Sequence, residues 1–325
     1  MMKMKLFLRV IFFSFVLISP SWVSAQKDYP AGPIQVEIGN PPGGGADLLT
    51  RGVAKEARKY LGQEILVTYR PGANGTVSLA HVVTVKPDGY YLGSTPSATV
   101  TNAPLILDLK FDPFKEIIPI IAFAKYNVVI TVRKDSPFKT LKDFLQYAKQ
   151  NPGKATYGHP GLGTGGHLTM AAIVAQEGIK MNFTPFSGDA PAITALLGGH
   201  IMASSGVAAG YVPHVQAGSL RLIAIYSEER LEDYPEVQCT AELGYAHPPR
   251  LWIFLYGPKG LPEPIVTKLE DAFGKASQSP SFKELTINNT AYLKRILVRE
   301  ELLKNLLAEK AAVADLFEKA GLMKK

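Results

Sequence analysis

The sequence contains a single cysteine, Cys239, in 325 residues, so the chain cannot form an internal disulfide. It also lacks a cluster of basic residues. The net charge of +7 is spread along the chain, and its longest basic runs are pairs such as Arg133-Lys134, which argues against a nucleic-acid-binding surface. We expect Cys239 to be a buried thiol and the fold to be stabilised by the size of its core.

Motifs of hydrolases and metal sites are also missing. The sequence has no G-x-S-x-G, H-E-x-x-H or C-x-x-C pattern, and its six histidines do not reach the spacing of metal ligands. We therefore expect neither a metal nor a cofactor.

The N-terminus has the pattern of a cleavable secretory signal peptide over residues 1–25. A basic start precedes an apolar stretch at residues 10–18, and the small-residue sequence Val23-Ser24-Ala25 follows it. The apolar stretch is shorter than the roughly 20 residues that a membrane-spanning helix needs. No cysteine lies near the predicted cut before Gln26, so we expect an exported protein without a lipid anchor.

Strands and helices alternate along most of the chain, which indicates an α/β fold of about two domains. A strand at residues 34–38, a glycine run and a helix with apolar residues at every fourth position, from Leu49 to Leu61, form a first unit. A second unit has a strand at residues 155–158, a loop at residues 159–166 and a helix from His167. Between the units, residues 117–132 form an extended passage typical of a chain that leaves one lobe for another.

Two amphipathic helices are predicted near the end of the chain. Ile265, Leu269 and Phe273 mark the core-facing side of the first helix. Leu303, Leu307 and the pair Leu316-Phe317 mark the core-facing side of the second.

Two glycine-rich loops carry the main functional signal. The first glycine loop, residues 42–47, and the second, residues 159–166, each lie between a predicted strand and a predicted helix. Glycine allows close approach of a ligand to the backbone, and the first N–H groups of a helix have no partner within the helix, so such loops can bind anions. Two such loops in two lobes are suited to gripping a small carboxylate from both sides.

Other interpretations of these loops remain open at this point. Both could be tight turns only. The second loop matches the dinucleotide-binding pattern G-x-G-x-x-G at Gly161, Gly163 and Gly166. That pattern needs an acidic residue at the end of the next strand, and the first acid there, Asp189, comes too late in the sequence. An exported hydrolase or transferase would use Ser94 or Thr164 with a histidine. Of the nearby histidines, His159 is the better candidate for a ligand contact, whereas His167 would either line the site or cap its helix.

The chain resembles the extracytoplasmic solute receptors of the tripartite tricarboxylate transporters, the TctC or Bug family, over its whole mature length. The matching blocks lie at residues 29–34, 42–47, 70–75, 86–90, 111–113, 152–154, 163–168, 188–191, 196–199, 213–214 and 217–218.

The resemblance implies a two-lobed periplasmic binding protein of type II, with each lobe a mixed sheet flanked by helices and the ligand cleft between the lobes. Residues 26–125 and 250–325 would form lobe I, and residues 126–249 lobe II. The protein would act in the periplasm of a Gram-negative bacterium as a monomer without enzymatic activity. It would deliver a small organic carboxylate to a large and a small integral-membrane transporter subunit. A sensor that presents the ligand to a membrane kinase would use the same site.

The resemblance also implies the ligand-binding residues. In lobe I these are Asn40, Pro42, Gly43, Gly44, Gly45, Ala46, Asp47, Ser94, Thr95, Pro96 and Ser97. In lobe II they are His159, Gly161, Gly163, Thr164, Gly165, Gly166, Gly206 and Val207.

Two positions depart from the family pattern. Many relatives have an acidic residue followed by asparagine where this chain has Gly206-Val207, and Asn40 replaces a common phenylalanine. In relatives that bind amino acids, that acidic residue can pair with the ammonium group of the ligand. We therefore expect a mono- or dicarboxylate, with room for an aromatic group, rather than an amino acid.

Overall fold

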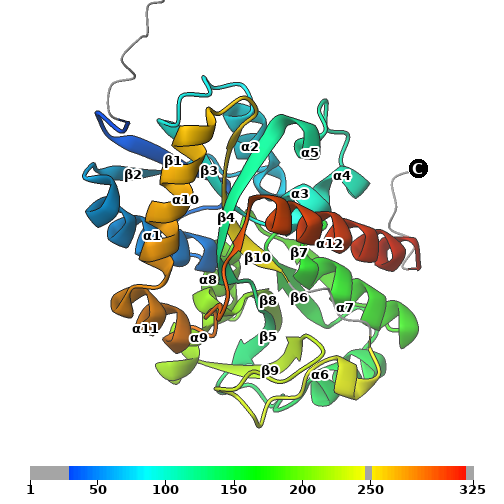
Figure 1. The fold of residues 1–325 in the computed structure, drawn as a ribbon. Helices are drawn as coiled ribbons and strands as arrows, with labels where there is room; N and C mark the ends of the chain where they lie inside the picture. The colour runs from blue at the N-terminus through cyan, green and yellow to red at the C-terminus, as the bar shows by residue number, and fades with distance from the viewer. Residues whose placement is uncertain (1–28, 246–250, 320–325) are drawn as a thin grey trace, which may run out of the picture.

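The computed structural model describes residues 29–245 and 251–319. They form two β-sheets flanked by helices, which gives the molecule two lobes, as the sequence predicts (Figure 1). The predicted signal peptide lies outside the described residues. Within the described ranges, no helix is both long and apolar enough to cross a membrane.

The six-stranded sheet of the first lobe has the order β11-β4-β10-β3-β1-β2, and its strands come from both ends of the chain. The strands are β1 (Ile34–Ile38), β2 (Ile65–Tyr69), β3 (Tyr91–Pro96), β4 (Ile117–Lys125), β10 (Trp252–Pro258) and β11 (Leu297–Val298). β1 pairs in parallel with β2 and β3, whereas β10 runs antiparallel to β3 and β4. The loops after β1 and β3 therefore leave the sheet at the same edge.

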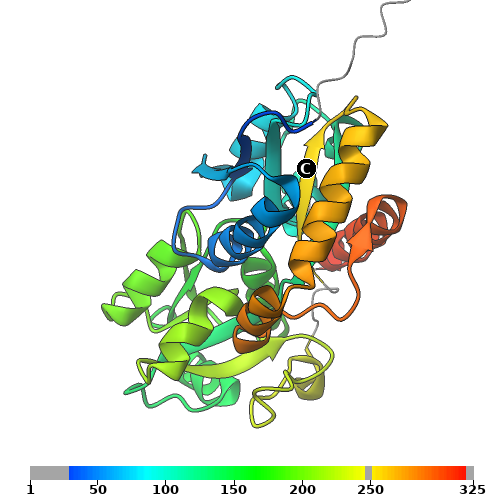
Figure 2. The same cartoon turned by 60° about the vertical axis from the view of Figure 1, so that its left-hand side comes forward.

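Helices cover both faces of this sheet. On one face, α1 (Gly45–Leu61) and α10 (Glu263–Ser277) lie side by side (Figure 2). The apolar side chains that α1 buries include Leu49 and Val53, as predicted. On the other face lie α2 (Thr76–Val82), α3 (Ala98–Thr101) and α12 (Arg299–Lys319). The remaining helices of this lobe are α4 (Ala103–Ile106), α5 (Pro113–Glu116) and α11 (Pro280–Asn288).

The second lobe has a five-stranded sheet in the order β7-β6-β8-β5-β9. Its strands are β5 (Val128–Arg133), β6 (Thr156–His159), β7 (Asn182–Pro185), β8 (Ala203–Val207) and β9 (Leu220–Tyr226). α6 (Leu141–Gln150) and α7 (Gly165–Gln176) cover one face, and α8 (Asp189–Leu197) and α9 (Ala208–Gln216) cover the other. The side chain of Cys239 is buried in this lobe, as expected.

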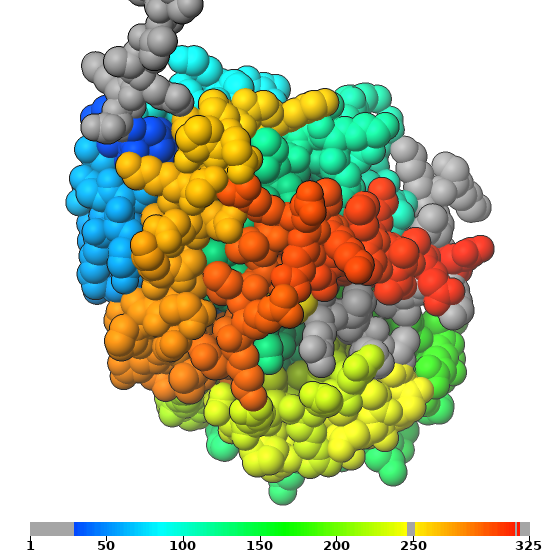
Figure 3. All heavy atoms as spheres, in the orientation of Figure 1, coloured from blue at the N-terminus to red at the C-terminus, as the bar shows by residue number. Residues whose placement is uncertain are grey.

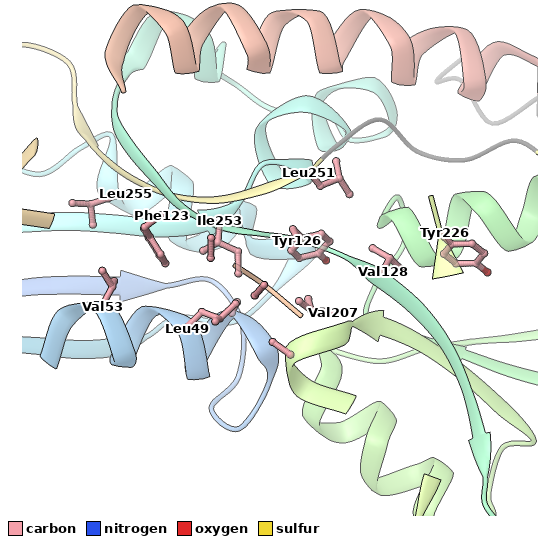
Figure 4. Close-up of a cluster of buried hydrophobic side chains, with 14 of the residues drawn as sticks. Leu49, Val53, Phe123, Tyr126, Val128, Val207, Tyr226, Leu251, Ile253 and Leu255 are labelled. Carbon is pink, nitrogen blue, oxygen red and sulfur yellow. The ribbon is translucent and has the colours of Figure 1, made fainter. Parts of the chain in front are cut away.

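The extended passage predicted between the lobes is present. β4 ends at Lys125 in the first sheet, and β5 begins at Val128 in the second. One apolar cluster runs through this junction, from Val53 and Leu49 in the first lobe to Tyr226 in the second (Figure 4). Tyr126 and Val207 lie between these two ends of the cluster, so the lobes share one core.

The C-terminal helix α12 contacts both lobes. Its Leu302 and Leu306 pack in the first lobe, whereas Val313 and Phe317 pack against Leu168 of α7 in the second. In Figure 3 this helix lies across the front of the molecule, above the yellow-green second lobe.

The predicted core-facing side of α12 is confirmed at Phe317, which is buried, and wrong by one position at Leu303 and Leu307, while the side chain of Leu316 lies outside the described part of the chain. Leu307 is 47% exposed and Leu303 is only partly buried, while their neighbours Leu306 and Leu302 face the core. Adjacent leucines fit either helical face, and the buried face also holds Glu309, which an apolar pattern cannot predict.

Other element boundaries also differ from expectation. β8 and α9 were not predicted, because β8 consists mostly of small residues and α9 contains Pro213. β3 continues to Pro96, beyond the strand that the sequence predicts at residues 90–93, so Ser94 and Thr95 lie within a strand. α7 begins at Gly165 rather than His167.

We expect Gly93→Ala to destabilise the first lobe. Gly93 in β3 lies under the ring of Tyr256, where a Cβ atom would be 2.1 Å from the ring carbon Cζ. Tyr256 is 1% exposed and has no space to move, so the free energy of unfolding should fall by about 1–3 kcal/mol. Denaturant unfolding measures the change. Gly32→Ala is the control, because no atom lies within 4 Å of its Cβ position; equal stability of the two variants would contradict the prediction.

Candidate functional site

The first glycine loop joins β1 to α1 and is closed by Asp47. The carboxylate Oδ2 of Asp47 accepts the N–H of Gly43 at 2.8 Å, and Oδ1 accepts hydrogen bonds from Arg51 and from the hydroxyl of Tyr69. Asp47 is 1% exposed. Its carboxylate, predicted as a ligand contact, thus holds the loop itself in place.

A second carboxylate reaches this loop from the other lobe. Asp189, the first residue of α8, accepts the N–H of Val207 at 3.3 Å and is also hydrogen-bonded by the N–H of Gly45. Asp189 therefore connects the N-terminus of α1 in the first lobe with the end of β8 in the second. In the sequence, Asp189 only lies too late for the acid of a dinucleotide site, and its spacing does not predict this position between the lobes.

Gly206 provides the space for the Asp189 carboxylate. A Cβ atom on Gly206 would lie 2.1 Å from Oδ1 of Asp189 and 2.6 Å from the ring of Tyr211. The volume that a side chain at position 206 would occupy is thus filled by the carboxylate of Asp189. The absence of an acid at position 206 therefore does not remove negative charge from this region, and the argument against an amino-acid ligand loses its basis.

Burial raises the pKa of Asp189 to about 7, and the hydrogen bonds from Val207 and Gly45 offset only part of this effect. The phenol groups of Tyr126 and Tyr211 are also buried, and the nearby carboxylate raises the pKa of each further. At neutral pH the carboxyl of Asp189 is therefore close to its midpoint of ionisation.

The second glycine loop joins β6 to α7. Gly161 and Gly163 have φ angles of 141° and 77°, which strongly favour glycine. Thr164 caps α7: its hydroxyl accepts the N–H of His167 at 3.4 Å and donates to the carbonyl of Gly161 at 2.7 Å. The first N–H groups of α7 point out of the helix at this loop without intrahelical partners.

Gly166 allows β8 to approach the start of α7. A Cβ atom on Gly166 would lie 2.0 Å from Oγ of Ser205, so no larger residue fits without displacing the strand. The carbonyl of Gly166 accepts a hydrogen bond from the hydroxyl of Tyr157 at 2.9 Å, which fixes the first turn of the helix.

Both predicted histidines lie at the second glycine loop and are uncharged at neutral pH. His159 is fully buried, its Nδ1 lies 2.9 Å from the carbonyl of Gly161, and its ring is 4.5 Å from that of His167. Burial, with the proximity of His167, lowers the pKa of His159 to about 4, and burial also lowers that of His167. Nδ1 of His167 accepts the N–H of Gly163 at 3.2 Å, so this residue supports the loop.

A loop of the first lobe faces the second glycine loop. A Cβ atom on Gly161 would lie 3.9 Å from Cβ of Asn74, and the backbone of Ala73 and Asn74 has φ angles of 43° and 56°. Such left-handed conformations cost free energy in residues other than glycine and occur often at functional positions. Nδ2 of Asn74 is buried without a partner in the described residues, as are Oδ1 of Asn40 and Nε2 of His159. The turn sequence Ala73-Asn74-Gly75 was the available signal for Asn74, which the sequence analysis did not place in the site.

The predicted contact residues 94–97 lie at the end of β3 and directly after it in the first lobe. The hydroxyl of Ser94 bonds to Thr50 at 2.8 Å, and that of Thr95 donates to Thr99 at 2.8 Å. Oγ of Ser97 accepts the N–H of Trp252 at 3.1 Å, and Pro96 is paired with Ile253 in the sheet. These predicted contact residues thus have structural partners.

The described residues do not assemble the hydrolase alternative. Ser94 is hydrogen-bonded to Thr50, and Thr164 donates to a carbonyl, so neither hydroxyl is bonded to a histidine in the part of the chain that the structure describes. Over the same ranges, no group of three or more histidine, cysteine, aspartate or glutamate residues could hold a metal ion.

A buried chain of hydrogen bonds links α12 to the second glycine loop. Oε1 of Glu309 lies 2.7 Å from the hydroxyl oxygen of Thr101, which is also 2.8 Å from Oδ1 of Asn102. The amide of Asn102 then donates to the carbonyl of Gly163 at 3.0 Å. The single hydroxyl proton of Thr101 cannot serve both acceptors, so a proton on Glu309 completes the chain. Burial raises the pKa of Glu309 to about 8, which fits this arrangement.

Comparisons with known proteins find relatives of this chain in sequence and in fold. The model of the tripartite tricarboxylate transporter family receptors, TctC, matches residues 49–297. The UPF0065 protein in the gbd 5' region of Cupriavidus necator is 37% identical, over 82% of this chain and 80% of that protein. The structure of the periplasmic binding protein BugD has a TM-score of 0.85 and 26% identity, covering 91% of this chain and 100% of that one. MatC from Rhodopseudomonas palustris with bound malate has a TM-score of 0.81 and 26% identity, covering 89% and 99%.

The contact between Gly206 and Asp189 predicts coupled substitutions. Gly206→Ala should lower the free energy of unfolding by about 1–3 kcal/mol, because the new methyl group overlaps Oδ1 of Asp189. In the Asp189→Ala background the same substitution should cost at least about 1 kcal/mol less, since that overlap is gone. Denaturant unfolding of the four proteins measures the coupling. Additive effects would show that the two side chains do not share this space.

Glu309→Gln should remove one source of pH dependence in stability. The pKa of Glu309 is raised in the folded state, from 4.5 to about 8, so its stabilising contribution is full below about pH 4.5 and is lost as the pH rises through 8. One such group gives a slope of at most about 1.4 kcal/mol per pH unit. Stability of both proteins, measured between pH 5 and pH 8.5, should diverge in favour of the glutamine variant at high pH. Parallel curves would contradict the prediction.

Proposed function

The chain belongs to the family of tripartite tricarboxylate transporter receptors, and from this premise we propose that it binds a small organic carboxylate between its lobes in the periplasm. The receptor then delivers this solute to a large and a small membrane subunit of the transporter. The malate bound to MatC, a relative of the same fold, supports a carboxylate ligand.

The second glycine loop is the place where the ligand carboxylate binds in this proposal. The N–H groups at the start of α7 are available as donors, and the helix dipole favours a negative charge there. The amide Nδ2 of Asn74 is buried next to this loop without a partner in the described residues, which is the observation that carries the assignment. A buried donor without an acceptor costs free energy, and a ligand oxygen or a ligand-bound water would satisfy it.

The first glycine loop contributes differently. Its Gly43 and Gly45 N–H groups already serve Asp47 and Asp189. In the proposed receptor this loop therefore closes against the second lobe and bounds the site, while the second loop supplies the anion-binding donors.

The proposed lobes follow the sheets. We assign residues 26–125 and 250–325 to lobe I and residues 126–249 to lobe II, in support of which β4 ends at Lys125 and β5 begins at Val128. Export by a signal peptide at residues 1–25 and action as a monomer complete the proposal.

The test is a thermal-shift screen of the chain from residue 26, unfolded and refolded to remove any bound solute, against mono- and dicarboxylates. A ligand that binds only the folded state raises the melting temperature. Asn74→Asp places a negative charge beside the second glycine loop with almost no change in shape, so it should weaken carboxylate binding at least tenfold, or about 1.4 kcal/mol, by calorimetry. Asn288→Asp adds the same charge at an exposed position and should not change affinity.

Two results would overturn the proposal. One is a refolded protein whose melting temperature no carboxylate raises. The other is equal affinity of the Asn74→Asp and Asn288→Asp variants for the ligand, which would show that the ligand carboxylate does not bind at the second glycine loop.

A further inference from the structure

Two carboxylates of the chain itself occupy the N-terminus of α1. Asp47 accepts the N–H of Gly43, and Asp189 is bonded by the N–H of Gly45. These two carboxylates already supply the negative charge that the N-terminus of α1 favours, so a ligand carboxylate there would be repelled by them. In this structure the anion at the first glycine loop is thus part of the protein.

The position of Asp189 is fixed from both lobes. A Cβ atom on Gly188 would lie 2.4 Å from Cδ of Pro41, and a Cβ atom on Gly44 would lie 3.3 Å from Cβ of Asp189. On the other side, the N–H of Val207 holds Oδ1 and the bare backbone of Gly206 lies against it. Asp189 is 5% exposed, so its carboxyl cannot turn away into solvent without separating the lobes.

This arrangement sets the number of negative charges that the closed site accepts. A ligand carboxylate at the second glycine loop meets backbone donors and the amide of Asn74. A second ligand carboxylate that extends toward α1 meets the carboxyl of Asp189 instead. Two like charges that share a buried site repel strongly, because the low dielectric screens them poorly.

We infer that Asp189 is a specificity-determining residue that restricts this receptor to monocarboxylates, because its side chain takes the place at α1 that the second carboxylate of a dicarboxylate would need. This inference rests on the proposed function and deepens it by naming the ligand class. The ligand's other end is uncharged or carries a hydrogen-bond donor, such as a hydroxyl or amide, that suits the carboxyl of Asp189.

The exclusion depends on pH in a defined direction. Asp189 has a pKa of about 7, so it repels a second carboxylate fully at pH 8.5 and only weakly at pH 6, where its carboxyl is protonated. The groups packed against it are the phenols of Tyr126 and Tyr211, which stay neutral over this range, and the backbone of α1 and β8. On α1 the nearest acid is Asp47, which is paired with Arg51.

The experiment compares ligands of equal chain length by calorimetry at pH 8.5 and pH 6. The pairs are butyrate with succinate, hexanoate with adipate, octanoate with suberate, and benzoate with terephthalate. For every pair of which one member binds, the wild-type protein should bind the monocarboxylate at least tenfold more tightly at pH 8.5, and the ratio should shrink at pH 6. In Asp189→Asn the ratio should fall to within about threefold at both pH values.

Controls separate this effect from structural damage and from other titrating groups. Asp271→Asn removes one exposed negative charge on α10 and should keep the wild-type ratio. Glu309 and His167 are also titratable, but both are intact in Asp189→Asn, so a pH dependence of the ratio that persists in that variant would show that Asp189 is not its source. Asp189→Ser replaces the asparagine variant if the latter has a lowered melting temperature without ligand.

The outcomes are distinct. Equal wild-type affinity for both members of a pair, or a ratio that Asp189→Asn leaves unchanged, overturns the role of Asp189 while the carboxylate receptor stands. Binding of no member of any pair to either protein, together with no carboxylate that raises the melting temperature in the thermal-shift screen, overturns the proposed function itself.

Discussion

Close approach of backbone to backbone at the junction of the lobes is the constraint on which the site depends. The N-terminus of α1 meets α9 with a Cβ position on Gly210 only 2.9 Å from the nitrogen of Gly45, and Gly206 lies directly against the carboxyl of Asp189. None of these contacts is possible with a side chain in the way. The glycines therefore do more than shape two turns: they let the lobes meet closely enough for a hydrogen bond from one lobe to reach a carboxyl of the other.

In the proposed receptor, an anion would be bound with almost no fixed positive charge. Its two histidines are held neutral by burial, and two of its acids, Asp189 and Glu309, have pKa values raised to about 7 and 8. The attraction for a ligand carboxylate would come from helix N-termini and amide dipoles. These groups do not titrate, and unlike a long charged side chain they cannot rotate away from the ligand. Such a site distinguishes ligands mainly by where charge lies along them and less by total charge.

Much of this architecture could be predicted from the sequence because it depends on local signals. The strand at residues 34–38 and the apolar row from Leu49 to Leu61 both follow from neighbouring residues, and the structure has them as expected. Asp189 and Asn74 could not be found in this way. Their proposed roles rest on contacts with Gly45, Val207 and Gly161, which are distant in the chain, and neither residue type is unusual in a turn or at the start of a helix.

The same limit explains the error in α12. Adjacent leucines at 302–303 and 306–307 fit two helical faces equally well, and the choice between them is made by what the helix packs against. A buried glutamate on that face is stable only because Thr101 and Asn102 lie opposite, which no pattern within the helix reveals.

The reach of α12 across both lobes limits how the molecule can open. One end of α12 packs in the first lobe through Leu302 and Leu306, and the other end packs on Leu168 of the second lobe through Val313 and Phe317. The lobes are therefore not connected by a hinge alone. If the lobes separate, the last turns of α12 must either lose their contact with α7 or shift along it. In the proposed receptor, the contact between α12 and α7 would therefore limit how far the lobes separate, and with it the size of the solute that can enter.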